Sequence, residues 1–201
     1  MQNSPSILKS NQKFSISITK NKDLLHQFYS LRNCCYKNEK NWSSFNGDEN
    51  DYDQAGHIIV AKNNEDSTVI GGARIMFENK EINFSNETPN SRYLYRRYLE
   101  EYKNETVPKN SIVEISSMVI LREYRNGTTF KNMVNYSLDF ITKNNKAHYV
   151  VCIAPLASCR LYKIIAKNFG YKAYIDMENQ WVNENHSYPI ESYLIYMKLR
   201  N

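Results

Sequence analysis

Residues 111–130 read SIVEISSMVILREYRNGTTF, and this stretch decides the fold. Its first half, 111–121, is an apolar run rich in β-branched residues, which predicts a buried strand. The run contains one acid, Glu114. A carboxylate inside an apolar strand costs free energy unless it is paired or functional. Glu114 is therefore either a functional residue or a core glutamate whose carboxylate is paired with another group of the protein.

The second half of the stretch predicts a turn and then a helix over 127–143. Arg122 and Arg125 lie in the turn, and Asn126 and Gly127 lie where the helix begins. The first backbone N–H groups of a helix have no partners inside the helix, so this turn is suited to hold an anion such as a phosphate. The competing interpretation is an ordinary turn with two solvated arginines.

Outward from this stretch, the chain alternates between strand and helix patterns. Asn21 is placed to cap the first helix, Gly170 is placed to end the last one, and the polar stretch 38–55 reads as a loop. The predicted strands are 13–19, 57–62, 67–77, 111–121, 148–154, 171–177 and 192–199, and the predicted helices are 23–37, 91–103, 127–143 and 155–170.

This order of elements predicts a single domain over 1–201 with an α/β fold of the layered α+β type, ending in a strand pair over 171–201. The central sheet is expected to be mixed, mostly antiparallel and opened like a V. Two helices should present apolar stripes to the core. Those stripes are Phe130, Val134, Leu138 and Ile141 in one helix, and Leu161, Ile164, Ile165 and Phe169 in the other.

The composition narrows the class of protein. With 41% hydrophobic residues and a net charge of +5, the 201-residue chain is globular and moderately basic. It shows no membrane-spanning run, signal-peptide pattern or nucleic-acid motif, so we expect a cytoplasmic protein without integral membrane association or nucleic-acid binding. Because adjacent cysteines lack the usual zinc-site spacing, we expect no metal site and four reduced thiols. The cysteines are Cys34, Cys35, Cys152 and Cys159.

An ordered set of further segments resembles the GNAT acyltransferases. Within that superfamily the chain is most similar to the acyl-homoserine-lactone (autoinducer) synthases and the long-chain N-acyl amino acid synthases. The resemblance covers roughly residues 13–170. The segments that carry it are Leu31-Arg32, Tyr36, Trp42, the acidic run Asp48–Asp53, His57, Gly71–Arg74 and Val113–Ser117.

The resemblance implies an enzyme that moves an acyl group from a thioester to an amine. Such a reaction needs a base that removes a proton from the amine, and Glu114 is the candidate. Its alternative role is a structural ion pair with Arg74 or another buried cation. Tyr162 is the candidate acid that protonates the leaving thiolate, and its alternative is one more ordinary tyrosine among 16.

The same resemblance assigns an amine-binding side to the site. It implies an ion-pair cluster of Arg32, Asp53 and Arg74 that holds the active-site loop 38–55. Trp42 would belong to a mobile lid over the donor, or would simply anchor a long loop. Ser116 and Ser117, which follow the strand acid, complete the predicted substrate-binding set.

The predicted donor side lies along 117–127. By resemblance, strand residues including Val119 and Leu121 would pair with the pantetheine arm, and Arg122, Arg125, Asn126 and Gly127 would hold phosphate. The usual pair of spaced glycines is reduced to Gly127, with Phe130 near the second position. This degenerate phosphate site favours acyl carrier protein as the donor, because that protein presents a single phosphate and an acidic surface. Acyl-CoA remains the alternative, and no permanently bound cofactor is expected.

Two departures bear on the product. The homoserine-lactone synthases have an arginine where this chain has Ser117, and usually an aspartate where it has Asn50. The predicted activity is therefore acyl transfer to an amine of another small metabolite or amino acid. The alternatives are a small-acyl GNAT that uses acetyl-CoA, and a non-catalytic module that binds an acyl group or a partner.

Overall fold

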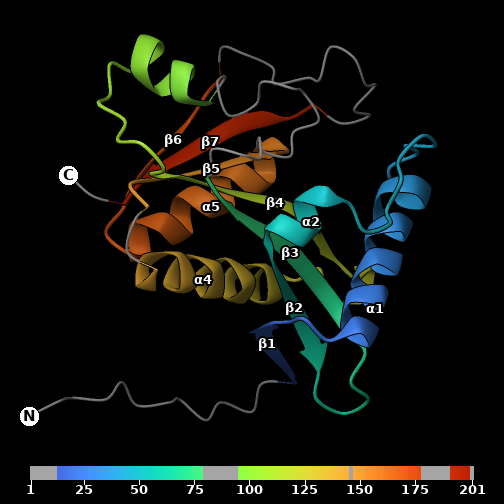
Figure 1. Ribbon diagram of the computed structural model, residues 1–201. Helices are drawn as coiled ribbons and strands as arrows, with labels where there is room; N and C mark the ends of the chain where they lie inside the picture. The colour runs from blue at the N-terminus through green and yellow to red at the C-terminus, as the bar shows by residue number, and fades with distance from the viewer. Residues whose placement is uncertain (1–12, 79–94, 145–146, 178–190, 200–201) are drawn as a thin grey trace, which may run out of the picture.

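The computed structural model describes residues 13–78, 95–144, 147–177 and 191–199. Helices and strands alternate along them (Figure 1). The strands are β1 (Phe14–Ile18), β2 (His57–Asn63), β3 (Val69–Phe77), β4 (Ile112–Ile120), β5 (Tyr149–Ala154), β6 (Lys172–Ile175) and β7 (Tyr193–Lys198). The α-helices are α1 (Lys22–Asn33), α2 (Asp51–Ala55), α4 (Gly127–Lys143) and α5 (Leu156–Asn168). The π-helical turns are η1 (Cys34–Glu39) and η2 (Tyr98–Tyr102), and η3 (Arg122–Tyr124) is a 3-10 turn.

The strands form one seven-stranded sheet in the order β1-β2-β3-β4-β5-β7-β6. Neighbouring strands are antiparallel except for β4 and β5, which are parallel. The β4–β5 ladder runs only from the pair Ile112–Tyr149 to the pair Glu114–Val151. Beyond Glu114 the two strands diverge, and the sheet opens there like a V. The predicted mixed, mostly antiparallel sheet is confirmed.

Helices cover both faces of the sheet (Figure 1). Adjacent glycines of β3 show which helix lies on which face, because successive strand residues point to opposite sides. A Cβ on Gly71 would lie 3.0 Å from Met133 of α4, and a Cβ on Gly72 would lie 2.3 Å from the ring of Phe28 of α1. Gly72 thus lets α1 approach β3 closely, and α1 and α4 lie on opposite faces.

The boundaries of the helices follow local chemistry. The side chain of Asn21 accepts hydrogen bonds from the backbone N–H groups of Asp23 and Leu24, so the predicted N-cap of α1 is confirmed. The α-helix ends at Asn33 rather than at 37 and continues as η1. Gly170, with φ of +77°, follows α5 and ends it. The predicted loop 38–55 contains a short helix, α2, which begins at Asp51.

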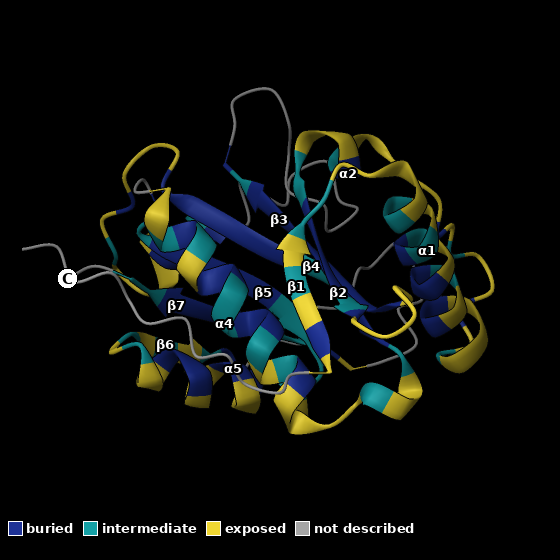
Figure 2. Ribbon diagram, turned by 90° about the horizontal axis from the view of Figure 1, so that it is seen from below, coloured by how far each residue is buried: buried dark blue, intermediate teal, exposed yellow. Residues whose placement is uncertain are grey.

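Most of the predicted core is buried, as the dark sheet in Figure 2 shows. The predicted core face of α5 is wrong for two residues: Leu161 is 40% exposed and Ile164 is 59% exposed. The buried residues of this helix are instead Cys159, Tyr162, Ile165 and Ala166. The helix is turned so that Tyr162 enters the core, which leaves Leu161 and Ile164 outside.

The remaining differences are at the edges of elements. Within the predicted helix 91–103, residues 95–97 are α-helical and 98–102 form the π-helical turn η2, while residues 91–94 lie outside the described part of the chain. The C-terminal strand pair consists of β6 and β7, which are antiparallel neighbours. Among the described residues, no helix is both long and apolar enough to cross a membrane.

Candidate active site

Glu114 lies in the centre of the sheet, where the V begins. On β4 it is paired with Met76 of β3 and with Val151 of β5. Its neighbours Val113 and Ile115 belong to the core under α4 and α5. Because side chains alternate along a strand, Glu114 points to the opposite face, the one covered by α1 and α2. It is 1% exposed, so its carboxyl group is removed from bulk water.

Asp53 is the centre of a buried ion-pair cluster on that same face. Arg32 binds its carboxylate with two parallel hydrogen bonds, Nη1 to Oδ1 at 2.9 Å and Nη2 to Oδ2 at 2.8 Å. Arg74 donates from Nη1 to Oδ1 at 2.8 Å. All three residues are at least 95% buried. The predicted contacts between Asp53 and the two arginines are thus present, and their role in the reaction stays a prediction.

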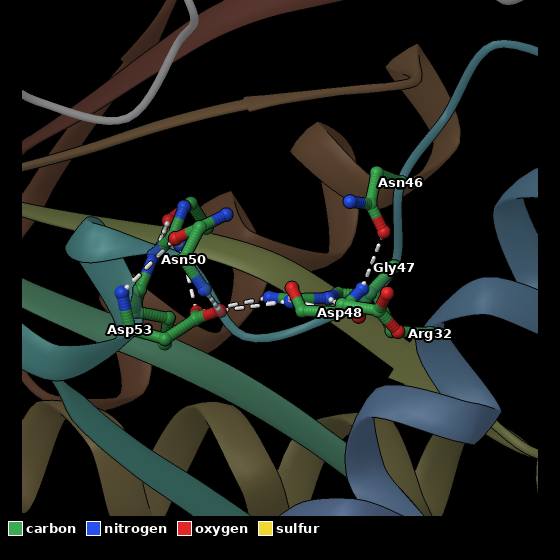
Figure 3. A network of polar contacts seen from close by, with 8 residues as sticks. Arg32, Asn46, Gly47, Asp48, Asn50 and Asp53 are labelled. Atoms are coloured by element: carbon green, nitrogen blue, oxygen red, sulfur yellow. Dashed lines mark hydrogen bonds and ion pairs between the residues drawn. The ribbon is translucent and has the colours of Figure 1, made fainter.

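The cluster also holds the loop that leads into α2 (Figure 3). Arg32 donates from Nε and Nη2 to the carbonyl oxygen of Gly47, at 3.1 and 2.9 Å, and from Nη2 to that of Asp48, at 2.6 Å. Asn50 and Asp53 cap the start of α2 reciprocally through their side chains and backbone N–H groups. One arginine of α1 therefore fixes both the end of the loop and the acid that follows it.

Arg74 connects this cluster to β4. Its Nε atom lies 3.3 Å from Oγ of Ser116, and its Nη1 atom lies 3.2 Å from Oδ1 of Asn50. Ser116 is two positions from Glu114, so the two side chains share one face of the strand. Glu114 therefore lies on the same face of the sheet as a charged wall, the name used below for the cluster of Arg32 from α1, Asp53 from α2 and Arg74 from β3.

A bulge in β4 changes the face to which its later residues point. The register shifts between the pairs Gly72–Val119 and Arg74–Ser116, so β4 has one extra residue there. Ser117 has a φ of +52°, in the left-handed region that L residues rarely adopt. After the bulge, Met118 packs against the core under α4 and α5, whereas Val119 packs with α1.

Tyr162 lies in the core at the open part of the V. Its hydroxyl group is 3.5 Å from Sδ of Met118, and its ring packs edge-on against the ring of Phe130, with centroids 5.0 Å apart. Burial raises the pKa of Tyr162 well above its usual value, and the neighbouring Cys152 of β5 adds to the effect. The hydroxyl group therefore remains protonated near neutral pH, which suits a proton donor.

Cys152 connects Tyr162 to Glu114. The pKa of its thiol is raised first by burial, then by Cys159 and by the carboxylate of Glu114, while a hydrogen bond with Tyr162 lowers it. Both candidate catalytic groups therefore influence the pKa of this thiol, and Cys152 and Tyr162 share the core under α4 and α5.

In the predicted phosphate-binding turn, the side chain of Arg125 already binds other groups of the protein. Arg125 donates from Nε to the carbonyl oxygen of Ile120 at 2.7 Å, and its Nη2 atom pairs with Oε2 of Glu39 at 2.5 Å and with Sγ of Cys35 at 3.3 Å. Arg122 is exposed on the turn η3. The predicted phosphate ligand Arg125 is therefore bound to η1 in this structure.

The start of α4 is partly capped by its own sequence. The side chain of Asn126 accepts a hydrogen bond from the backbone N–H of Thr129 at 3.0 Å. A Cβ on Gly127 would have nothing within 4 Å, so the backbone there is open to a ligand. The N–H of Leu121 donates to the carbonyl oxygen of Ile70 at 2.8 Å, and Val119 is paired with Gly72 on β3.

Trp42 is an anchor of the loop in this structure. It is buried and packs against Tyr36 and Phe45, with ring centroids 6.0 and 4.9 Å apart.

Sequence reasoning missed Glu39 and Cys35, the partners of Arg125. Their spacing of four residues, which places them on one side of a helical turn, was the available signal. Among the described residues, no group of His, Cys, Asp and Glu is arranged to hold a metal ion.

Comparison with known proteins agrees with this geometry. No curated protein matches the chain in sequence. The acetyltransferase (GNAT) domain family matches residues 31–135, which is more than half of the chain. The matched region contains the ion-pair cluster, Glu114 and the predicted phosphate-binding turn between β4 and α4, called the donor turn below.

Solved structures with the same fold include three synthases of acylated products. The AHL synthase LasI has a TM-score of 0.60 at 14% identity, covering 93% of this chain and 90% of that one. BjaI, a CoA-dependent acyl-homoserine lactone synthase with SAM and isopentyl-CoA, has a TM-score of 0.60 at 18% identity, covering 90% and 78%. FeeM, an N-acyl amino acid synthase from uncultured soil microbes, has a TM-score of 0.60 at 8% identity, covering 92% and 91%.

At these identities the likeness to solved structures concerns the fold, and the family match carries the assignment. The resemblance found in the sequence is confirmed at the level of the superfamily, and its synthase branch is represented among the structures that share the fold. The chain therefore belongs to the acetyltransferase (GNAT) domain family and is an acyltransferase.

Proposed function

We propose that the chain transfers an acyl group from a phosphopantetheine thioester to the amine of a small metabolite or amino acid in the cytoplasm. One observation carries the proposal. Where the β4–β5 ladder ends, the buried carboxylate of Glu114 lies on β4, and the buried hydroxyl group of Tyr162 lies 3.5 Å from Sδ of Met118 on the same strand. A base and a proton donor beside one strand are the two groups that acyl transfer from a thioester to an amine can use.

The proposed reaction moves one acyl group and removes two protons from the acceptor nitrogen. Glu114, directly or through a water molecule, takes the first proton from the ammonium group of the acceptor and passes it to solvent. The neutral amine attacks the thioester carbonyl carbon, a C–N bond forms, and the C–S bond breaks. Tyr162 gives its proton to the departing thiolate, and the second proton lost by the nitrogen restores the Tyr162 hydroxyl group through solvent. The products are an amide, a free thiol and one released proton, so atoms and charges balance.

The charged wall around Asp53 gives the acceptor its place. Arg32 and Arg74 surround the Asp53 carboxylate, and Arg74 also reaches Ser116 beside the acid of β4. We propose that this wall orients an acceptor that itself carries charge, as an amino acid does. Ser117 stands where the homoserine-lactone synthases have arginine, which supports a different amine as acceptor.

The donor is either acyl carrier protein or acyl-CoA, which share the phosphopantetheine arm. The open backbone at Gly127 and the exposed Arg122 support a phosphate site at the start of α4. The degenerate glycine pattern and the net charge of +5 favour the acidic carrier protein. BjaI, which is CoA-dependent by description, shows that a protein with this fold uses CoA thioesters.

The test has two parts. Purified protein is given acyl-CoA and acyl carrier protein thioesters with a panel of amino acids, and release of free thiol is measured. Extracts of cells that express the chain are compared by mass spectrometry with extracts of cells that express Glu114→Gln. Thiol release and a new amide that depend on Glu114 support the proposal. Thioester binding without thiol release in every combination would leave the non-catalytic module as the correct alternative.

A further inference from the structure

We infer that the outer side of α5 is a docking surface for an anionic membrane, on which the protein lies peripherally. This surface, called the α5 face below, has two parts, an aliphatic stripe and a row of basic residues. The stripe consists of Ala157, Leu161 and Ile164, and the row consists of Arg160, Lys163 and Lys167. The inference does not depend on the proposed acyl transfer, because the α5 face lies outside the candidate active site.

The aliphatic stripe leaves branched side chains in water. Leu161 is 40% exposed and Ile164 is 59% exposed, although leucine and isoleucine are among the residues most often buried. Residues three and four apart share one face of a helix, so the exposed Ala157 continues the stripe by one turn toward the start of α5. The opposite side of the helix, which includes Tyr162 and Ile165, is buried in the core. The helix therefore cannot bury the stripe against the sheet without exposing its core side.

The basic row runs along one edge of this stripe. Arg160, Lys163 and Lys167 follow one another at spacings of three and four residues, and all three are exposed. The helix itself, Leu156–Asn168, contains no aspartate or glutamate. Like charges at this spacing repel one another and weaken the helix. An anionic partner would replace this repulsion with attraction.

The neighbouring helix α4 treats its exposed charges differently. Its Lys143 pairs with Asp139, four residues earlier, with Nζ and Oδ2 2.6 Å apart. Within the described residues, the three basic side chains of α5 have no such ion-pair partner. The α5 face thus combines exposed aliphatic groups with uncompensated positive charge, and its partner must be both apolar and anionic.

The size and shape of the α5 face favour a lipid surface over an acidic protein. Its six side chains are few beside the roughly 20–30 residues that each partner contributes to a standard protein–protein interface. A lipid surface needs no shaped partner, because headgroups and acyl chains adapt to a convex helix. The alkyl stems of lysine and arginine can extend the stripe while their charged ends reach the headgroups. Aliphatic residues beside basic ones are typical of helices that lie in the membrane interface.

The position of α5 leaves this face accessible. In Figure 2 the helix lies along the border of the molecule, with exposed residues on its outer side. The buried residues of α5 belong to the same core as those of α4, whereas α1 covers the other face of the sheet. A membrane bound at α5 would therefore not cover the charged wall that α1, α2 and β3 form.

The experiment measures binding of the full chain to lipid vesicles by co-sedimentation. Vesicles of phosphatidylcholine alone are compared with vesicles of equal parts of phosphatidylcholine and phosphatidylglycerol, which are anionic. A stripe variant combines Leu161→Ser with Ile164→Ser. A row variant combines Arg160→Gln, Lys163→Gln and Lys167→Gln. Circular dichroism checks that each variant is folded.

Each variant has a matched control outside α5. Met177→Ser is the control for the stripe, because Met177 follows β6 and is 57% exposed, much like Ile164. The control for the row removes three exposed lysines on the side of α1, and it combines Lys20→Gln, Lys22→Gln and Lys37→Gln. The two triple variants lose the same net charge, so they separate a docking surface from a general effect of charge.

We expect the wild type and Met177→Ser to bind the anionic vesicles equally well, and to bind phosphatidylcholine alone far more weakly. The row variant should lose about fivefold in affinity per removed charge, and the stripe variant about tenfold in total. Binding should also weaken as salt is added.

Absence of binding to the anionic vesicles would overturn the inference, as would an equal loss in the two triple variants. If vesicles do not bind but the row variant weakens binding of an acidic protein such as acyl carrier protein, the α5 face docks a protein and the inference is equally wrong. None of these outcomes decides the proposed function, because thiol release is not measured.

Discussion

The two faces of the sheet at β4 hold their polar groups in different ways. On the face of α1 and α2, the Asp53 carboxylate is bound by two arginines with three hydrogen bonds of 2.8–2.9 Å. On the face of α4 and α5, the hydroxyl group of Tyr162 lies 3.5 Å from the weak acceptor Sδ of Met118. The difference teaches that this sheet buries charge on one side of β4, where ion pairs compensate it, and keeps the other side apolar.

The largest expected effect tests the charged face. Glu114→Gln keeps the shape of the side chain but removes the basic carboxylate, so turnover should fall roughly 10²–10⁴-fold. Steady-state thiol release measures this. Donor binding should not change, because the proposed donor site along 117–127 does not include Glu114. The matched control is Glu65→Gln, in the exposed turn after β2, which should retain full turnover. Normal turnover in Glu114→Gln would remove the carboxylate from the mechanism.

The second prediction concerns how much the ion pairs of the same face contribute to the stability of the protein. Asp53→Asn leaves two buried arginines without their carboxylate, which should lower the free energy of unfolding by about 3–5 kcal/mol. Denaturant unfolding measures this loss, and Asp51→Asn on the exposed side of α2 is the control. A double-mutant cycle with Arg74→Met should be strongly non-additive. Additive losses would mean that the two residues do not act as a pair.

The charged face was also the more predictable one. The cluster of Arg32, Asp53 and Arg74 was predicted from the resemblance to the GNAT acyltransferases, and the structure joins the three residues. The strands along the chain were predicted from their apolar patterns, and the mixed sheet was predicted from the order of strands and helices. Prediction failed where one residue changes the phase: the bulge at Ser117 and the rotation of α5 cannot be read from periodicity, because both depend on packing across the V.

A third, smaller effect probes the apolar face. Tyr162→Phe removes the proton donor but keeps the ring against Phe130, and turnover should fall about tenfold, since a thiolate leaves readily even without protonation. Because burial raises the pKa of Tyr162 well above its usual value of 10.0, loss of its proton should not reduce wild-type turnover between pH 7 and 9. The exposed Tyr174→Phe is the control. An unchanged turnover in Tyr162→Phe would leave the tyrosine with a packing role only.

The smallest effect lies at the donor turn, where the two faces meet. Arg125 belongs to the turn between β4 and α4, yet it pairs with Glu39 of η1, and the two side chains are 39% and 31% exposed. A partly exposed pair of this kind contributes about 0–1 kcal/mol, so a donor phosphate can compete with Glu39 for the arginine. Removing an arginine of the turn and removing the charge of Glu39 should therefore change the Michaelis constant of the donor in opposite directions.

Arg125→Ala and Arg122→Ala should each raise that constant up to about fivefold, and Glu39→Gln should lower it by a similar factor, because the arginine is then free for phosphate. With acyl carrier protein the effect should weaken steeply as salt is added, since its acidic surface meets a basic chain, whereas acyl-CoA should respond less. If Glu39→Gln instead raises the Michaelis constant for both donors, the pair holds η1 in its working position, and phosphate binds elsewhere along the turn.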